Sequence, residues 1–155
     1  MGRQAKYSKE QFVQAALDIV ATHGPSAATM SRIAQELGAP IGSVYHRFPS
    51  RDILLATLWI SIVESYQAEF LEVLQQGDGL NAALFGVLWT RKHPNEARIL
   101  LLYRREELIA GEWPDEVRNR ARELAEEVDD GIRDFARKLL GRADRNSLRR
   151  IRSGR

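Results

Sequence analysis

Apolar side chains recur at every third or fourth position along most of the chain, which is the spacing of a helix that buries one face. No segment alternates apolar and polar positions with the period of a strand. Together with candidate cap residues, the pattern predicts helices over residues 8–24, 29–37, 41–48, 50–77, 80–92, 95–109 and 114–141. We therefore expect an all-α fold.

The segment 29–48 predicts two short helices joined by a tight turn, the arrangement of a helix-turn-helix unit. Thr29 is a candidate N-cap, since its hydroxyl can accept a hydrogen bond from an unpaired backbone amide. Gly38 follows the last apolar residue of the first helix, where the backbone must leave right-handed helical geometry. Pro40 restricts the backbone so that a second helix can begin at Ile41. An apolar seam is expected to hold the two helices together, formed by Ile33, Leu37, Ile41, Val44 and Phe48.

Small, polar and aromatic side chains remain for the outer face of the second helix. Gly42 and Ser43 leave space and a hydroxyl near its first turn. Tyr45 and Arg47 have the length and polarity to contact phosphates, and His46 can reach a phosphate or a base edge. These residue types favour a helix that enters a DNA groove over an unpartnered surface of a helical bundle.

A framework of spaced residues extends over the first third of the chain. Its members are Ala15, Ala16, Leu17, Gly24, Thr29, Ile33, Ala34, Leu37, Gly38, Val44, Tyr45, Phe48, Leu54 and Leu55. This framework resembles the TetR family of bacterial transcriptional regulators, and the resemblance covers the spacing of residues across three helices rather than one short pattern.

This resemblance implies a helix-turn-helix DNA-binding domain over residues 1–50 and a helical ligand-binding and dimerisation domain over residues 51–155. The partners would be double-stranded operator DNA and a second copy of the chain. Carried over by position, the DNA-facing residues would be Thr29, Ser31, Arg32, Ser43, Tyr45, His46, Arg47 and Arg51, with Ile41 and Gly42 close to the groove.

The carboxyl-terminal end departs from the family, whose members usually continue with a further pair of helices that build an intersubunit bundle. Here the sequence after Gly141 is Arg-rich, weakly apolar and ends at Arg155. A shortened chain, a naturally reduced member, or dimerisation through the helix over 114–140 would each explain the difference. We still expect a homodimer, because one three-helix unit makes few phosphate contacts.

Charge is segregated along the 155 residues. Residues 1–52 carry a net charge of +2, residues 53–132 a net charge of −7, and residues 133–155 a net charge of +7. The net positive charge of residues 1–52 favours binding to a polyanion, and Arg3 and Lys6 can extend toward a minor groove of DNA. For the basic end, a solvated helix face is favoured over a second nucleic-acid contact.

Composition is that of an ordinary globular protein, with 44% hydrophobic and 28% charged residues. The most apolar run, residues 53–63, is too short to cross a bilayer, so no membrane partner is expected. No targeting segment is recognised, and the absence of cysteine is compatible with the cytoplasmic location that we expect.

The carboxyl-terminal part holds more aromatic side chains than a minimal core needs. They are Trp59, Tyr66, Phe85, Trp89, Tyr103 and Trp113. Such rings usually form core, but the resemblance implies a pocket for an unknown small-molecule effector, which they are then expected to line. His93 and Arg104 are candidates for polar contacts there.

Nothing in the sequence indicates catalysis, a metal site or a cofactor. The three histidines, His23, His46 and His93, lie far apart, and there is no phosphate-binding glycine loop or nucleophile elbow. The hypothesis is a TetR-like regulator, and we expect a repressor that an effector releases from its operator. The alternative is a helical protein-interaction module that retains the helix-turn-helix unit without regulating transcription by itself.

Overall fold

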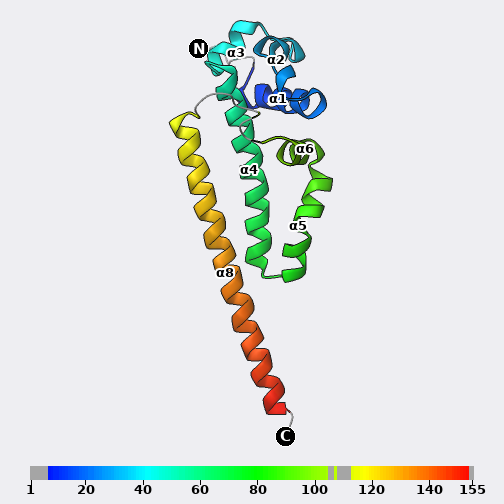
Figure 1. Cartoon of the computed structure of the whole chain (residues 1–155), viewed down its shortest axis with the longest axis vertical. Coiled ribbons are helices and arrows are strands. Elements are labelled where there is room, and N and C mark those ends of the chain that lie inside the picture. The colour runs from blue at the N-terminus through cyan, green and yellow to red at the C-terminus, as the bar shows by residue number, and fades with distance from the viewer. Residues whose placement is uncertain (1–6, 105–106, 108–112, 154–155) are drawn as a thin grey trace, which may run out of the picture.

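The computed structural model describes residues 7–104, 107 and 113–153, and within these it is helical without a strand, as expected. The elements are α1 (Lys9–His23), the 3-10 helix η1 (Pro25–Ala27), α2 (Met30–Glu36), α3 (Ile41–Arg47), α4 (Arg51–Gln76), α5 (Gly79–Lys92), α6 (Pro94–Leu102) and α8 (Asp115–Ser153). Helices α1 to α3 gather at one end of an elongated molecule, and α4 and α8 run side by side away from them (Figure 1).

Local capping explains where the helices begin. Ser8 forms a capping box with Gln11, and the side chains of Thr29, Ser50 and Asp78 each accept from backbone amides in the first turn of the helix that follows. At its other end, α4 stops at Gly77, whose φ of 71° is left-handed and costs glycine little. These caps confirm the predicted starts of α1, α2 and α4.

One continuous apolar core joins the amino-terminal helices to the rest of the molecule. Its largest fully buried side chains include Phe12 of α1, Ile33 of α2, and Leu54 and Leu58 of α4, and the same cluster continues to Ile99 of α6. Since α4 contributes to the core beneath α1 and α2, its first turns are part of the amino-terminal unit rather than a flexible hinge.

Helix α6 is shorter than the sequence pattern predicts: it ends at Leu102 rather than at residue 109. Tyr103 adopts an extended conformation, with φ −120° and ψ 133°, and its side chain packs against the core. Burial of an aromatic ring therefore outweighs continuation of the helix at this point. Residues 105, 106, 108 and 109 of the predicted helix lie outside the described part of the chain.

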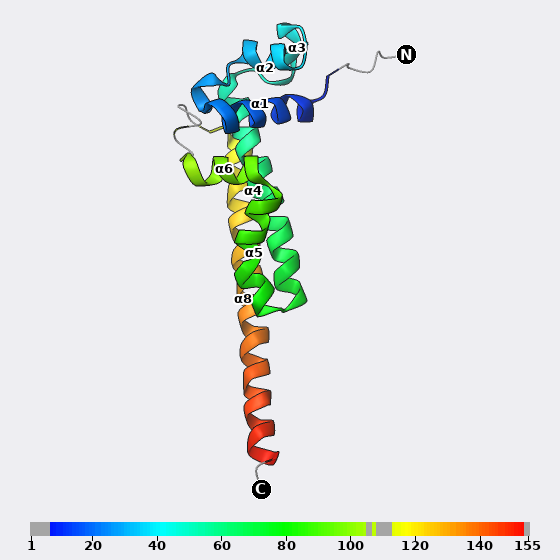
Figure 2. The same ribbon diagram turned by 90° about the vertical axis from the view of Figure 1, so that its right-hand side faces the viewer.

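The prediction that the last helix ends at Gly141 is wrong, since α8 continues to Ser153. A glycine inside a helix costs only about 1 kcal/mol relative to alanine, and no proline follows to stop the helix. Both views show α8 passing the ends of α4 and α5 and continuing alone (Figures 1 and 2). None of the described helices combines the length and apolar character needed to cross a bilayer.

Candidate nucleic-acid interface

Helices α2 and α3 are joined by the tight turn that the sequence predicts. Gly38 has a φ of +59°, and its amide donates to the carbonyl of Gln35 at 3.0 Å. The amide of Ala39 donates back to the carbonyl of Ala34 at 2.9 Å, which closes the carboxyl end of α2. The chain then enters α3 after Pro40, and α3 packs directly against α2.

The apolar seam between the two helices forms with one exception. Ile33, Val44 and Phe48 are fully buried, and Leu37 is partly buried against the same cluster. Ile41, in contrast, remains 46% exposed, so its assignment to the seam is wrong. It is the first residue of α3 and lies one turn from Tyr45, on the outer side of the helix.

The outer face of α3 is open to solvent and lies at the end of the molecule remote from the carboxyl terminus (Figure 2). Tyr45 is 52% exposed, His46 and Gly42 are exposed, and Arg47 is half-buried. An exposed tyrosine next to an imidazole and a guanidinium provides hydrogen-bond donors that suit phosphate oxygens.

All ten residues expected to face DNA have some solvent exposure. Those classed as exposed are Thr29, Ser31, Ile41, Gly42, Tyr45 and His46, and those half-buried are Arg32, Ser43, Arg47 and Arg51. The Thr29 hydroxyl accepts from the Arg32 amide at 3.2 Å, and a hydroxyl in this role still has a proton to donate.

Arg51 differs from the other nine, because its guanidinium turns toward the protein. Its Nε donates to the carbonyl of Ala28 at 2.8 Å, and Nη2 donates to the carbonyl of Pro25. These bonds satisfy two backbone oxygens of the segment that links α1 to α2. The structure therefore gives Arg51 a positioning contact within the protein.

Sequence reasoning did not single out Tyr7, whose hydroxyl donates to the Gly38 carbonyl at 3.0 Å. This bond ties the beginning of α1 to the turn between α2 and α3 across 31 positions of sequence. Nearby, Lys9 places its Nζ 5.9 Å from the centre of the Phe48 ring, which adds a cation beside the end of α3. No local pattern signals either contact, because both depend on how α1 packs.

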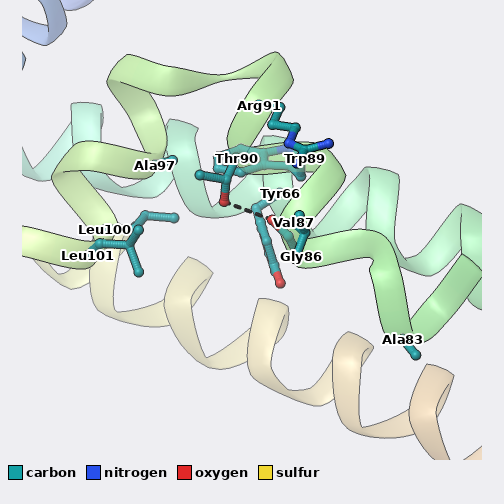
Figure 3. A pocket seen from close by; sticks show the side chains of 10 residues that line it. All are labelled: Tyr66, Ala83, Gly86, Val87, Trp89, Thr90, Arg91, Ala97, Leu100 and Leu101. Carbon is teal, nitrogen blue, oxygen red and sulfur yellow. Dashed lines mark hydrogen bonds between the residues drawn. The ribbon is translucent and has the colours of Figure 1, made fainter.

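A second feature is a cavity of about 640 Å³ at α5 and α6, a size typical of small-molecule sites. Figure 3 shows Gly86 and Val87 of α5 on one side, Leu100 and Leu101 of α6 on the other, and Tyr66 of α4 between them. The walls are mainly apolar.

Only two of the six aromatic residues expected at a pocket, Tyr66 and Trp89, line this cavity. Phe85 is buried in the core at 6% exposure, and Trp59, Tyr103 and Trp113 pack against that core. His93 does not line the cavity either, but stacks on Trp89 with ring centres 4.8 Å apart. The aromatic surplus in the sequence therefore mostly serves core packing.

Helix α6 connects the cavity with α1. Ala97, Leu100 and Leu101 of α6 face the cavity, while Asn95 at the start of the same helix donates to the Asp18 carboxylate of α1 at 3.2 Å. At the other end of α6, the Tyr103 hydroxyl lies close to Gly24 of α1's carboxyl-terminal cap. Displacing α6 would therefore disturb contacts that hold α1.

The capped α2, the tight turn and the exposed α3 define a helix-turn-helix unit of the DNA-binding class. Residues 12–58 match the family model described as bacterial regulatory proteins, tetR family. Residues 12–58 are thus similar to the amino-terminal domain of the TetR family, which confirms the resemblance seen in the sequence.

The fold is also similar to a solved structure of a proposed tetR family transcription regulator from Shewanella sp. PV-4. The two chains are 21% identical with a TM-score of 0.61, and the similarity covers 88% of this chain and 72% of that one. No curated protein matches the chain.

Proposed function

We propose that the chain is a DNA-binding transcriptional regulator that inserts α3 into the major groove of an operator. The observation that carries this proposal is the exposed face of α3, where Tyr45, His46 and Arg47 follow a buried Val44. Phosphate contacts would position the domain, and the side chains nearest the first turn of α3 would contact base edges. This is a binding function and needs no catalytic group.

The active form that we propose is a homodimer joined along α8. This helix leaves large apolar side chains uncovered at Ile132, Leu139 and Leu140, which are 46%, 39% and 68% exposed. Its last part also extends beyond α4, and an isolated helical segment of that kind is marginal in water without a partner. A second copy of α8 would cover these side chains and hold two α3 helices toward one duplex.

We further propose repression that is relieved by a small molecule in the cavity of α5 and α6. Support comes from the position of α6, which has the cavity on one side and the Asn95–Asp18 hydrogen bond to α1 on the other. A ligand can act in this way only if it binds one spacing of the two α3 helices better than another.

Selection of bound sites from random duplexes tests the proposal most directly. The expected outcome is a palindrome whose half-sites lie about 34–36 Å apart, one turn of DNA. Absence of any enriched sequence, with retained self-association of the chain, would favour a protein-interaction module instead. An enriched site without two-fold symmetry would exclude the proposed dimer while leaving the role of α3 intact.

A further inference from the structure

The cavity of α5 and α6 combines apolar walls with one cation. Val87, Leu100 and Leu101 supply aliphatic surface, and Trp89, which is 3% exposed, supplies an aromatic wall. Arg91 also lines the cavity and is itself exposed. Within the described part of the chain, no carboxylate forms an ion pair with Arg91, so its guanidinium is available to an anion that enters.

The Thr90 hydroxyl of the lining is less available than Arg91. The Thr90 hydroxyl already donates to the carbonyl of Gly86 at 2.7 Å, one turn earlier in α5 (Figure 3). Lys92, next to Arg91 in sequence, is held by Glu69 at 2.9 Å and does not line the cavity. Arg91 is therefore the charged group that a ligand in this cavity would meet.

The charge of the surrounding helices has the same sign as Arg91. Residues 79–102, which form α5 and α6, carry three basic and one acidic side chain, a net charge of +2. The neighbouring α4 carries a net charge of −3, and residues 115–132 of α8 carry −4. The cavity thus opens between two helices of net positive charge, although the neighbouring α4 and the first part of α8 are acidic, and this local charge disfavours a cationic ligand.

From these observations we infer that the cavity binds an amphipathic organic anion, an apolar monocarboxylate whose chain or ring contacts Val87, Leu100 and Trp89 and whose carboxylate pairs with Arg91. The inference rests on the proposed effector site and names the chemistry of its ligand. A carboxylate matches the planar, forked donors of a guanidinium, and the apolar body explains why the remaining walls are hydrocarbon.

Isothermal titration calorimetry with three matched probes tests this inference: octanoate, octanol and octylammonium. They share the same apolar chain and differ in the charge of the head group. Octanoate is expected to bind about tenfold more tightly than octanol, and octylammonium more weakly than either. Equal affinities for octanoate and octanol, tighter binding of octylammonium, or no binding of octanoate would each overturn the inference.

Two variants locate the site. Arg91→Gln should weaken octanoate about tenfold and leave octanol unchanged. The matched control is Arg98→Gln, which removes an exposed arginine of α6 that does not line the cavity and should change neither affinity. If both variants lose octanoate binding equally, general surface charge rather than Arg91 attracts the anion, and the inference fails.

Gly86→Leu tests whether the ligand occupies the cavity itself. A Cβ at Gly86 would lie 3.9 Å from the Tyr66 hydroxyl, an ordinary contact, and we expect the rest of the leucine side chain to occupy the cavity that Gly86 lines. Both octanoate and octanol binding should be lost. Unchanged octanoate binding would place the ligand elsewhere and overturn the inference.

DNA binding by the ligand-free protein distinguishes this inference from the proposed function. If the unmodified chain binds no DNA, the proposed function fails whatever octanoate does. If DNA binding persists and octanoate shows no preference, only the ligand assignment fails.

Discussion

Gly131 of α8 lies so close to Leu71 of α4 that a Cβ placed on it would clash with Leu71 Cδ2. A methyl group at Gly131 therefore requires the Leu71 side chain to shift. Gly131→Ala should displace the Leu71 side chain and lower the free energy of unfolding by about 1–3 kcal/mol, the usual cost of overpacking. Urea unfolding followed by circular dichroism measures this change.

The control for that substitution is Gly141→Ala in the same helix. Gly141 is exposed and nothing lies within 4 Å of its Cβ position, so alanine should stabilise α8 by about 0.5–1 kcal/mol through helix propensity alone. If alanine lowers the free energy of unfolding at Gly131 and raises it at Gly141, the close approach of Gly131 to Leu71 is supported. A stabilising effect at both positions would show that α8 and α4 do not approach closely at Gly131.

Arg51→Ala should reduce stability without changing the electrostatics of DNA binding. The substitution removes the Arg51 donor from the Ala28 carbonyl and one of two donors from the Pro25 carbonyl, which also accepts from the Ala28 amide, and we expect this to cost about 1–3 kcal/mol. The dependence of DNA affinity on salt should keep its slope, because the guanidinium contacts the protein. A slope reduced by about 0.9 would instead identify Arg51 as a phosphate ligand.

Arg47→Ala and Tyr45→Phe should weaken binding to every duplex rather than to one sequence. Removing a phosphate contact of Arg47 lowers the slope of log affinity against log salt by about 0.9, whereas the neutral Tyr45 hydroxyl affects affinity but not that slope. Fluorescence anisotropy over a range of salt concentrations separates the two effects. Unchanged affinity and slope in both variants would reject a phosphate role for this face of α3.

Glu69→Gln should reduce the loss of folding stability that occurs as the pH falls below 4.5. The hydrogen bond from Lys92, together with the charges of Lys92 and His93, lowers the pKa of Glu69 below its ordinary value of 4.5. A lowered pKa in the folded state stabilises the protein above pH 4.5, and this contribution disappears as the pH falls through the lowered value.

Thermal unfolding measured between pH 7 and pH 3 checks the Glu69 prediction. At pH 7 the variant should have the lower Tm, and the difference from the unmodified chain should shrink below pH 4.5. Glu72→Gln, at an exposed position of the same helix, is the control and should leave the curve unchanged. A constant difference across this range would show that the Glu69 charge does not contribute to the effect.

The amino-terminal helices were predictable because their signals are local. Ser8, Thr29 and Ser50 cap helices through atoms within three residues of themselves, and Gly38 supplies the positive φ of the turn. The end of α6 was not predictable from such signals, since packing of Tyr103 against the core decides it. The predicted helix end at Gly141 was wrong for a related reason, since a glycine permits a helix to end but does not require it.

By itself, the sequence determined the all-α class, the helix-turn-helix unit and the resemblance to the TetR family, because capping and apolar periodicity act over a few residues. Tertiary structure alone decided that Arg51 holds the link between α1 and α2, that most of the expected pocket aromatics are core, and that Arg91 lines the cavity. Each of these outcomes depends on contacts between helices far apart in the chain, and the free energy of burial that selects them has no local pattern.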